Sequence, residues 1–147
     1  MSKDWTIDTW VLYKVVEYNF CAASFIETII NKQHYIVMDS EGKIDAEYRK
    51  CFSSVSNEAR RALSKWYRSM RKRIYSHCLD EDCKRKLEEF EFDQDDWPFV
   101  GVCVKSNDKN LVAEESDYTD EVKNYLINDL GINVLSVQHA LDNCQEI

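Results

Sequence analysis

Acidic side chains recur at positions where a fold of alternating helices and strands would gather them. They lie in four separate segments of the chain, as Asp8, Glu47, Asp96, Glu115 and Asp117. In an open parallel sheet, the carboxyl ends of the strands meet at one edge, where active sites form. Carboxylates gathered at that edge repel one another unless a divalent cation joins them. The pattern therefore indicates metal-dependent phosphodiester chemistry.

The ligand type restricts which cation such a site would take. Hard carboxylate oxygens suit Mg²⁺ or Mn²⁺, and such an ion activates water and stabilises charge on a phosphoryl group. Taken singly, Asp96 also fits a helix N-cap, Glu47 an exposed helix position and Asp117 a turn. Asp8 is harder to explain in this way, because the apolar run from Trp5 would bury it and an unpaired buried carboxylate is costly.

Short apolar runs alternate with longer segments of helical periodicity. The strands and helices that these segments predict determine where the acidic residues lie. The runs predict strands at residues 5–9, 35–38, 111–113 and 132–135. Residues 11–31 predict a helix with a break at 19–22, and Ser56 is expected to cap a helix that runs to about Tyr75. Asp96 and Thr119 are each expected to open a further helix. The alternation predicts an α/β fold, a three-layer α/β/α sandwich on a parallel sheet of four to five strands.

Composition limits the class of protein. The 147 residues are 44% apolar with three Gly and one Pro, which predicts a single globular domain over residues 1–147. No signal-peptide pattern and no apolar run of about 20 residues is present, so we expect a cytoplasmic protein with reduced thiols and no membrane contact. His77-Cys78 with Cys83 lacks a second Cys/His pair at metal spacing, which disfavours a zinc site.

The charge is unevenly distributed along the chain. The net charge is −8, yet residues 49–86 contain twelve Lys and Arg against four Asp and Glu. If the predicted helix continues to Tyr75, four of these cations share one helical stripe: Arg61, Lys65, Arg68 and Lys72. Such a stripe is either a solvated helix face or a surface that binds the phosphates of a nucleic acid.

The order of the acidic segments resembles that of the PIN domain, a family of metal-dependent nucleases. The first matching segment is Ile7-Asp8-Thr9-Trp10-Val11-Leu12, and the second places Glu47 before Tyr48. The third is Asp96-Trp97-Pro98-Phe99-Val100-Gly101, and the last runs from Leu111 to Tyr118. The ending Gly131-Ile-Asn-Val-Leu135 is similar to the final strand of the family. The resemblance covers nearly the whole chain in order.

The resemblance implies roles for the acidic residues. Asp8, Glu47 and Asp96 would bind Mg²⁺ or Mn²⁺, with Asp117 at the rim of the site. Two positions depart from the family pattern: Glu115 replaces an Asp, and Ala113 replaces a Thr or Ser whose hydroxyl would orient a ligand. The cationic stripe would hold the nucleic-acid backbone.

The resemblance also implies an activity. We expect an endoribonuclease that acts on RNA, such as a toxin, an RNA-processing enzyme or a defence nuclease. An inhibitory antitoxin-like protein partner and a homodimer are expected on the same ground. The alternatives are a binding or scaffold protein with a weakened metal site, and a structure-specific deoxyribonuclease. A phosphatase with Asp8 as nucleophile would need a second acid at the place of Trp10.

Overall fold

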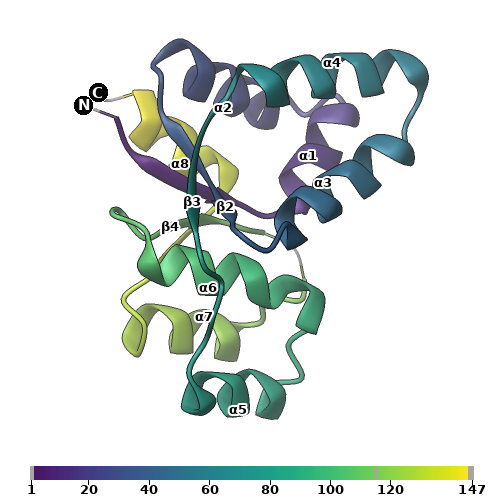
Figure 1. Ribbon diagram of the computed structural model, residues 1–147. Helices are drawn as coiled ribbons and strands as arrows, with labels where there is room; N and C mark the ends of the chain where they lie inside the picture. The colour runs from purple at the N-terminus through teal and green to yellow at the C-terminus, as the bar shows by residue number, and fades with distance from the viewer. Residues whose placement is uncertain (1, 115, 146–147) are drawn as a thin grey trace.

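The computed structural model describes residues 2–114 and 116–145, which form a parallel sheet flanked by helices (Figure 1). In chain order the elements are β1 (Asp4–Ile7), α1 (Thr9–Val16), α2 (Phe20–Asn31), β2 (Tyr35–Asp39), α3 (Lys43–Ser53), α4 (Asn57–Ser69), β3 (Arg71–Tyr75), α5 (Glu81–Glu89), the 3₁₀ turn η1 (Gln94–Asp96), α6 (Trp97–Lys105), β4 (Asn110–Val112), α7 (Asp120–Asn128), β5 (Asn133–Leu135) and α8 (Val137–Gln145).

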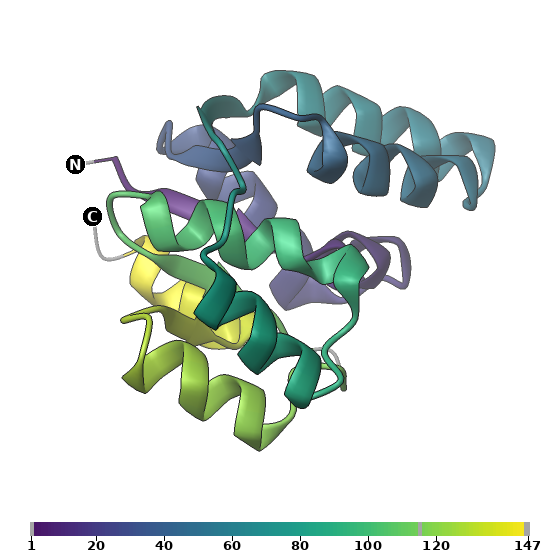
Figure 2. The same cartoon turned by 60° about the horizontal axis from the view of Figure 1, so that its bottom comes forward.

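The five strands are arranged in the order β3-β2-β1-β4-β5, and every neighbouring pair is parallel. On one face α6 packs across the strands, with α7 and α5 beside it, and on the other α2 packs against α8 (Figures 1 and 2). This arrangement confirms the predicted α/β/α sandwich. Helices on both faces are needed because the three inner strands β1, β2 and β4 bury nearly all of their side chains, on both sides of the sheet.

The central strand β1 shows why the sheet is covered on both faces. All four of its residues are buried, and its side chains alternate between the two helical layers. Trp5 is completely buried and meets the Phe25 ring of α2 edge to face, with the centroids 5.3 Å apart. The carboxyl end of β1 is therefore enclosed by protein, and the residue that follows it enters a largely dry environment.

Side-chain caps define several helix starts. The Asn19 side chain accepts a hydrogen bond from the Ala22 amide, which separates α1 from α2 at the predicted break. The Ser56 and Thr119 side chains cap α4 and α7 in the same way. The caps at Ser56 and Thr119 were predicted, because short polar side chains satisfy the free amides of a first helical turn.

One predicted element is wrong. The helix expected to reach Tyr75 ends at Ser69, and Met70 turns the chain into the edge strand β3, which pairs with β2. The strand is held through its side chains as well, since Arg73 Nε lies 3.1 Å from a carboxylate oxygen of the buried Asp4. Lys72 therefore lies on a strand, and it does not share a helical stripe with Arg61, Lys65 and Arg68 as predicted.

Two smaller differences concern the acidic segments. The strand predicted at residues 5–9 ends at Ile7, and Thr9 already belongs to α1. Asp96 directly precedes α6 as predicted, but it lies in η1 and its side chain makes no capping hydrogen bond. Pro98 stands in the first turn of α6, where its missing amide hydrogen has no cost.

Candidate metal centre

Asp8 is the most enclosed of the predicted site residues. Its amide donates to the Val112 carbonyl at 3.0 Å, so the backbone that carries it is pinned between β1 and β4. Its carboxylate is the N-cap of α1 and accepts a hydrogen bond from the Trp10 amide at 3.1 Å. The residue is 2% exposed. The strand-to-helix junction thus orients the carboxylate at the carboxyl edge of the sheet.

Burial changes the acidity of Asp8. Desolvation raises the pKa of its carboxyl group from 3.8 to about 6, because the charged form loses its hydration. The Trp10 amide and the Tyr118 hydroxyl favour the charged form, whereas the negative charge of Asp117 opposes it. A divalent cation close to Asp8 would remove this penalty, because it would stabilise the carboxylate directly.

Three further carboxylates meet on the segments that face this junction. Oxygens of Asp93, Asp96 and Asp117 all lie within 4.8 Å of one another. Asp93 precedes η1 and Asp96 ends it, whereas Asp117 belongs to the segment that follows β4. Two oxygens bound to one cation lie at most about 4.2 Å apart for Mg²⁺ and about 5 Å apart for Ca²⁺. Ca²⁺ therefore reaches oxygens at the 4.8 Å limit directly, and Mg²⁺ or Mn²⁺ would draw the side chains inward by a few tenths of an ångström. The donor set therefore fits a hard divalent cation.

An aromatic contact links the two acidic segments and Asp8. The rings of Phe92 and Tyr118 pack edge to face with centroids 5.0 Å apart. The Trp97 indole donates to the Phe92 carbonyl at 3.1 Å, which closes the loop that carries Asp93 and Asp96. The Tyr118 hydroxyl lies 3.5 Å from the Asp8 carboxylate. The packed rings of Phe92 and Tyr118 therefore hold the segments that carry Asp93 and Asp117 close to Asp8.

The remaining predicted ligands are placed differently. Glu47 lies on α3 and forms an ion pair with Lys50 at 3.6 Å. It lines a cavity of about 710 Å³ that also contacts Asp95, Trp97 and Pro98, so it approaches the start of α6 without joining the carboxylate group of Asp96. The predicted ligand Glu115 lies outside the described residues. Ala113 is 2% exposed and provides no hydroxyl.

The predicted cationic surface is located apart from these acids. Arg61, Lys65 and Arg68 are exposed on α4, which lies on the far side of α3 from α6 (Figures 1 and 2). The Lys72 ammonium group donates to the Tyr67 carbonyl at 2.7 Å and lies over the Tyr67 ring. The cations that line the cavity beside Glu47 are Lys43, Lys50 and Lys84.

Two acidic positions at the same edge were not predicted as site residues. Asp93 joins Asp96 and Asp117, and Asp39 is buried at the end of β2. Asp39 follows an apolar run just as Asp8 does, which is a signal that sequence reasoning could have used. Its carboxylate accepts hydrogen bonds from the Lys43 and Ile44 amides at 2.9 and 2.8 Å, so it fixes the start of α3.

Comparison of the chain with protein families, with curated protein sequences and with solved structures finds no match. Over residues 2–114 and 116–145, no helix is both long enough and apolar enough to cross a membrane.

Proposed function

We propose that this protein is a divalent-cation-dependent nuclease of the PIN type that cleaves RNA. The observation that carries the proposal is Asp8, a buried carboxylate beside Asp117 at the edge where Asp93 and Asp96 also converge. A buried carboxylate close to a second acid is costly to keep charged, and it is relieved either by a bound cation or by protonation. The order of these residues along the chain also agrees with the family resemblance.

Asp93, Asp96 and Asp117 would hold the cation, with Asp8 as the enclosed acid beside them. A bound Mg²⁺ or Mn²⁺ ion would lower the pKa of a coordinated water and stabilise negative charge on the phosphate. The chain's own contribution is position: the α1 cap orients Asp8, and the Phe92–Tyr118 contact keeps the two acidic segments together. Removing the Asp8 charge is therefore expected to abolish activity without unfolding the protein.

The substrate strand would lie in the cavity between α3, α5 and η1. This cavity is bordered by Glu47 and Asp95, and three ammonium groups line it, those of Lys43, Lys50 and Lys84. Lysines that neutralise phosphates supply most of the sequence-independent affinity for a nucleic acid. These lysines are better placed for that role than Arg61, Lys65 and Arg68 on α4, because they adjoin the loop that carries Asp96.

The decisive experiment is cleavage of a labelled single-stranded RNA with and without Mn²⁺. Wild-type protein should cleave only with Mn²⁺, and Asp8→Asn should not cleave. Asp142→Asn removes an exposed acid of α8 and should behave as wild type. Equal cleavage by Asp8→Asn and wild type would overturn the assignment. A matched DNA strand, cleaved in place of RNA, would favour the deoxyribonuclease alternative.

The scaffold alternative is favoured by Ala113, which provides no hydroxyl near the site. Calorimetry with Mn²⁺ separates it from an active enzyme: a scaffold would bind no Mn²⁺ in an Asp8-dependent way. The protein partner and the homodimer implied by the family resemblance stay predictions.

A further inference from the structure

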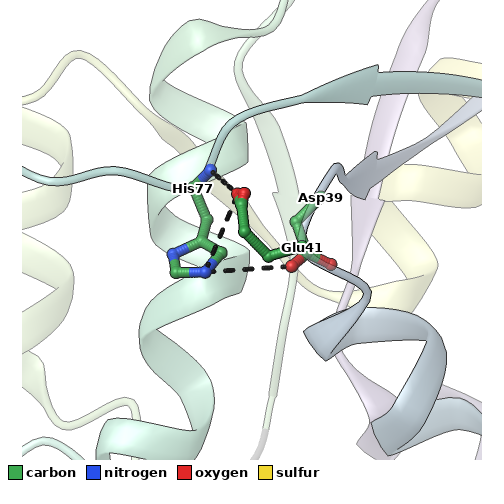
Figure 3. A group of neighbouring side chains, drawn as sticks. All are labelled: Asp39, Glu41 and His77. Carbon is green, nitrogen blue, oxygen red and sulfur yellow. Dashed lines mark hydrogen bonds and ion pairs between the residues drawn. The ribbon is translucent and has the colours of Figure 1, made fainter.

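A second group of side chains with metal-ligand chemistry lies at the carboxyl ends of β2 and β3, and none of them is assigned above to the nuclease site. It consists of Asp39, Glu41 and His77 (Figure 3). The His77 Nε2 atom lies 3.9 Å from an Asp39 carboxylate oxygen and 3.8 Å from a Glu41 carboxylate oxygen. One ligand atom from each residue lies within 4.8 Å of the other two.

Strand pairing brings these residues together. The β2–β3 register sets Asp39 beside Tyr75, and the Ser40 amide continues the ladder to the Tyr75 carbonyl at 2.8 Å. The His77 amide then donates to the Glu41 carboxylate at 3.1 Å. These two hydrogen bonds therefore hold the loops that follow β2 and β3 together without a ligand.

The neighbouring helix fixes the place of His77. Gly101 of α6 packs so closely that a Cβ atom there would lie 2.2 Å from the His77 carbonyl oxygen. Asp39 is held equally firmly, since each of its carboxylate oxygens accepts one amide hydrogen bond from the start of α3. A second lone pair on each of these oxygens stays available to a metal.

We infer that Asp39, Glu41 and His77 form a binding site for a divalent transition-metal ion, with Zn²⁺ as the ion of choice. Zinc bonds to imidazole nitrogen and carboxylate oxygen are about 2.0–2.2 Å long, so the donors of a tetrahedral site lie about 3.3–3.6 Å apart. The separations of 3.8 and 3.9 Å exceed this spacing by a few tenths of an ångström, which a small side-chain movement closes. One nitrogen and two oxygen donors suit Zn²⁺ better than Mg²⁺, because imidazole favours the softer ion.

The same separations are too long for direct hydrogen bonds between the His77 imidazole and the two carboxylates. Both exceed the 2.7–3.2 Å of an N–H···O hydrogen bond, so the imidazole bonds directly to neither carboxylate. The site is also open on one side, because Glu41 and His77 line the cavity of about 710 Å³. Three protein ligands with a fourth position open to solvent is the arrangement of zinc sites that accept water or a substrate group.

The ligand set shares only His77 with the group His77, Cys78 and Cys83, whose spacing disfavoured a zinc site. Cys83 is 3% exposed, and its thiol contacts Tyr125, so it lies in the core and away from His77. Burial raises the pKa of the Cys83 thiol, which disfavours the thiolate that a metal needs. The imidazole of His77 instead meets oxygen donors supplied by β2 and its following turn.

The test is Zn²⁺ titration of the metal-free protein by calorimetry, with Co²⁺ absorption to report the ligand field. Wild type should bind Zn²⁺ at this site, and both His77→Gln and Glu41→Gln should bind it at least about tenfold more weakly. His139→Gln removes an exposed imidazole of α8, and Cys78→Ser removes the exposed thiol beside His77. Both controls should bind as wild type.

The Asp8→Asn variant makes the result independent of the nuclease proposal, because it should keep Zn²⁺ binding while losing RNA cleavage. Equal Zn²⁺ affinity of wild type, His77→Gln and Glu41→Gln would overturn the inference, as would no binding by wild type. Glu41 is exposed, so Glu41→Gln decides the matter if His77→Gln fails to fold.

Discussion

Replacing Asp8 by Asn is expected to stabilise the protein at neutral pH. The side chain is nearly inaccessible, and burial raises the pKa of its carboxyl group from 3.8 to about 6. Keeping it charged in the folded state costs about 1.4 kcal/mol for each unit of that difference, which totals about 3 kcal/mol above pH 6. Asn carries no charge, and its carbonyl oxygen can still accept the Trp10 amide hydrogen bond.

The sign of the pH dependence follows from the raised pKa. Between about pH 4 and pH 6 the folded state binds more protons at Asp8 than the unfolded state, so the free energy of unfolding falls as the pH rises. Well below pH 4 the carboxyl group is protonated in both states and the penalty disappears. The advantage of Asn should therefore be only about 0.5 kcal/mol at pH 4 and reach about 1–3 kcal/mol at pH 7.

Urea unfolding at pH 4, 5.5 and 7 in the presence of EDTA measures this difference. Asp142→Asn, an exposed acid on α8, is the matched control and should change stability little at any of these pH values. In a parallel series with Mn²⁺, wild type should gain more stability than Asp8→Asn, because the variant keeps Asp93, Asp96 and Asp117 but lacks the adjacent negative charge. A variant that is less stable than wild type at pH 7, or an advantage that does not change with pH, would refute the burial argument.

Three further substitutions test the contacts that hold the edge of the sheet, each by its urea midpoint. Gly101→Ala should lower stability by about 1–3 kcal/mol or more, because the added methyl group meets the His77 carbonyl; an unchanged midpoint would disprove this close approach. Tyr48→Phe should cost about 1–2 kcal/mol, since the buried Ile7 carbonyl loses its hydroxyl donor at 2.5 Å. Thr119→Ala should cost about 1 kcal/mol through the lost α7 cap, and Thr119→Ser should restore most of it.

The proposed substrate cavity has its own test. With the inactive Asp8→Asn background, Lys50→Ala together with Lys84→Ala should weaken RNA binding and reduce its salt dependence by about 1 to 2 in the logarithmic slope. The matched pair Arg61→Ala and Lys65→Ala, on α4, should change the slope little. If the α4 pair lowers the slope and the Lys50/Lys84 pair does not, the RNA-binding surface lies on α4.

Local sequence determined much of this protein. Short apolar runs and helical patterns predicted the alternation of strands and helices, and the short polar residues Ser56 and Thr119 marked helix starts. The burial of Asp8 was also predicted, because this residue ends an apolar run. The structure confirms it, since Asp8 is 2% exposed. These features depend on residues within one turn or one strand of each other, so the nearby sequence contains the information.

Tertiary structure alone decided the features that depend on distant partners. The edge strand β3 has no alternating apolar pattern, since both of its faces are largely open, and its pairing with β2 defines it. The meeting of Asp93 with Asp117, and of His77 with Asp39, joins segments more than 20 residues apart. Such contacts depend on which strands become neighbours, and hydrogen bonding across the whole sheet sets that order.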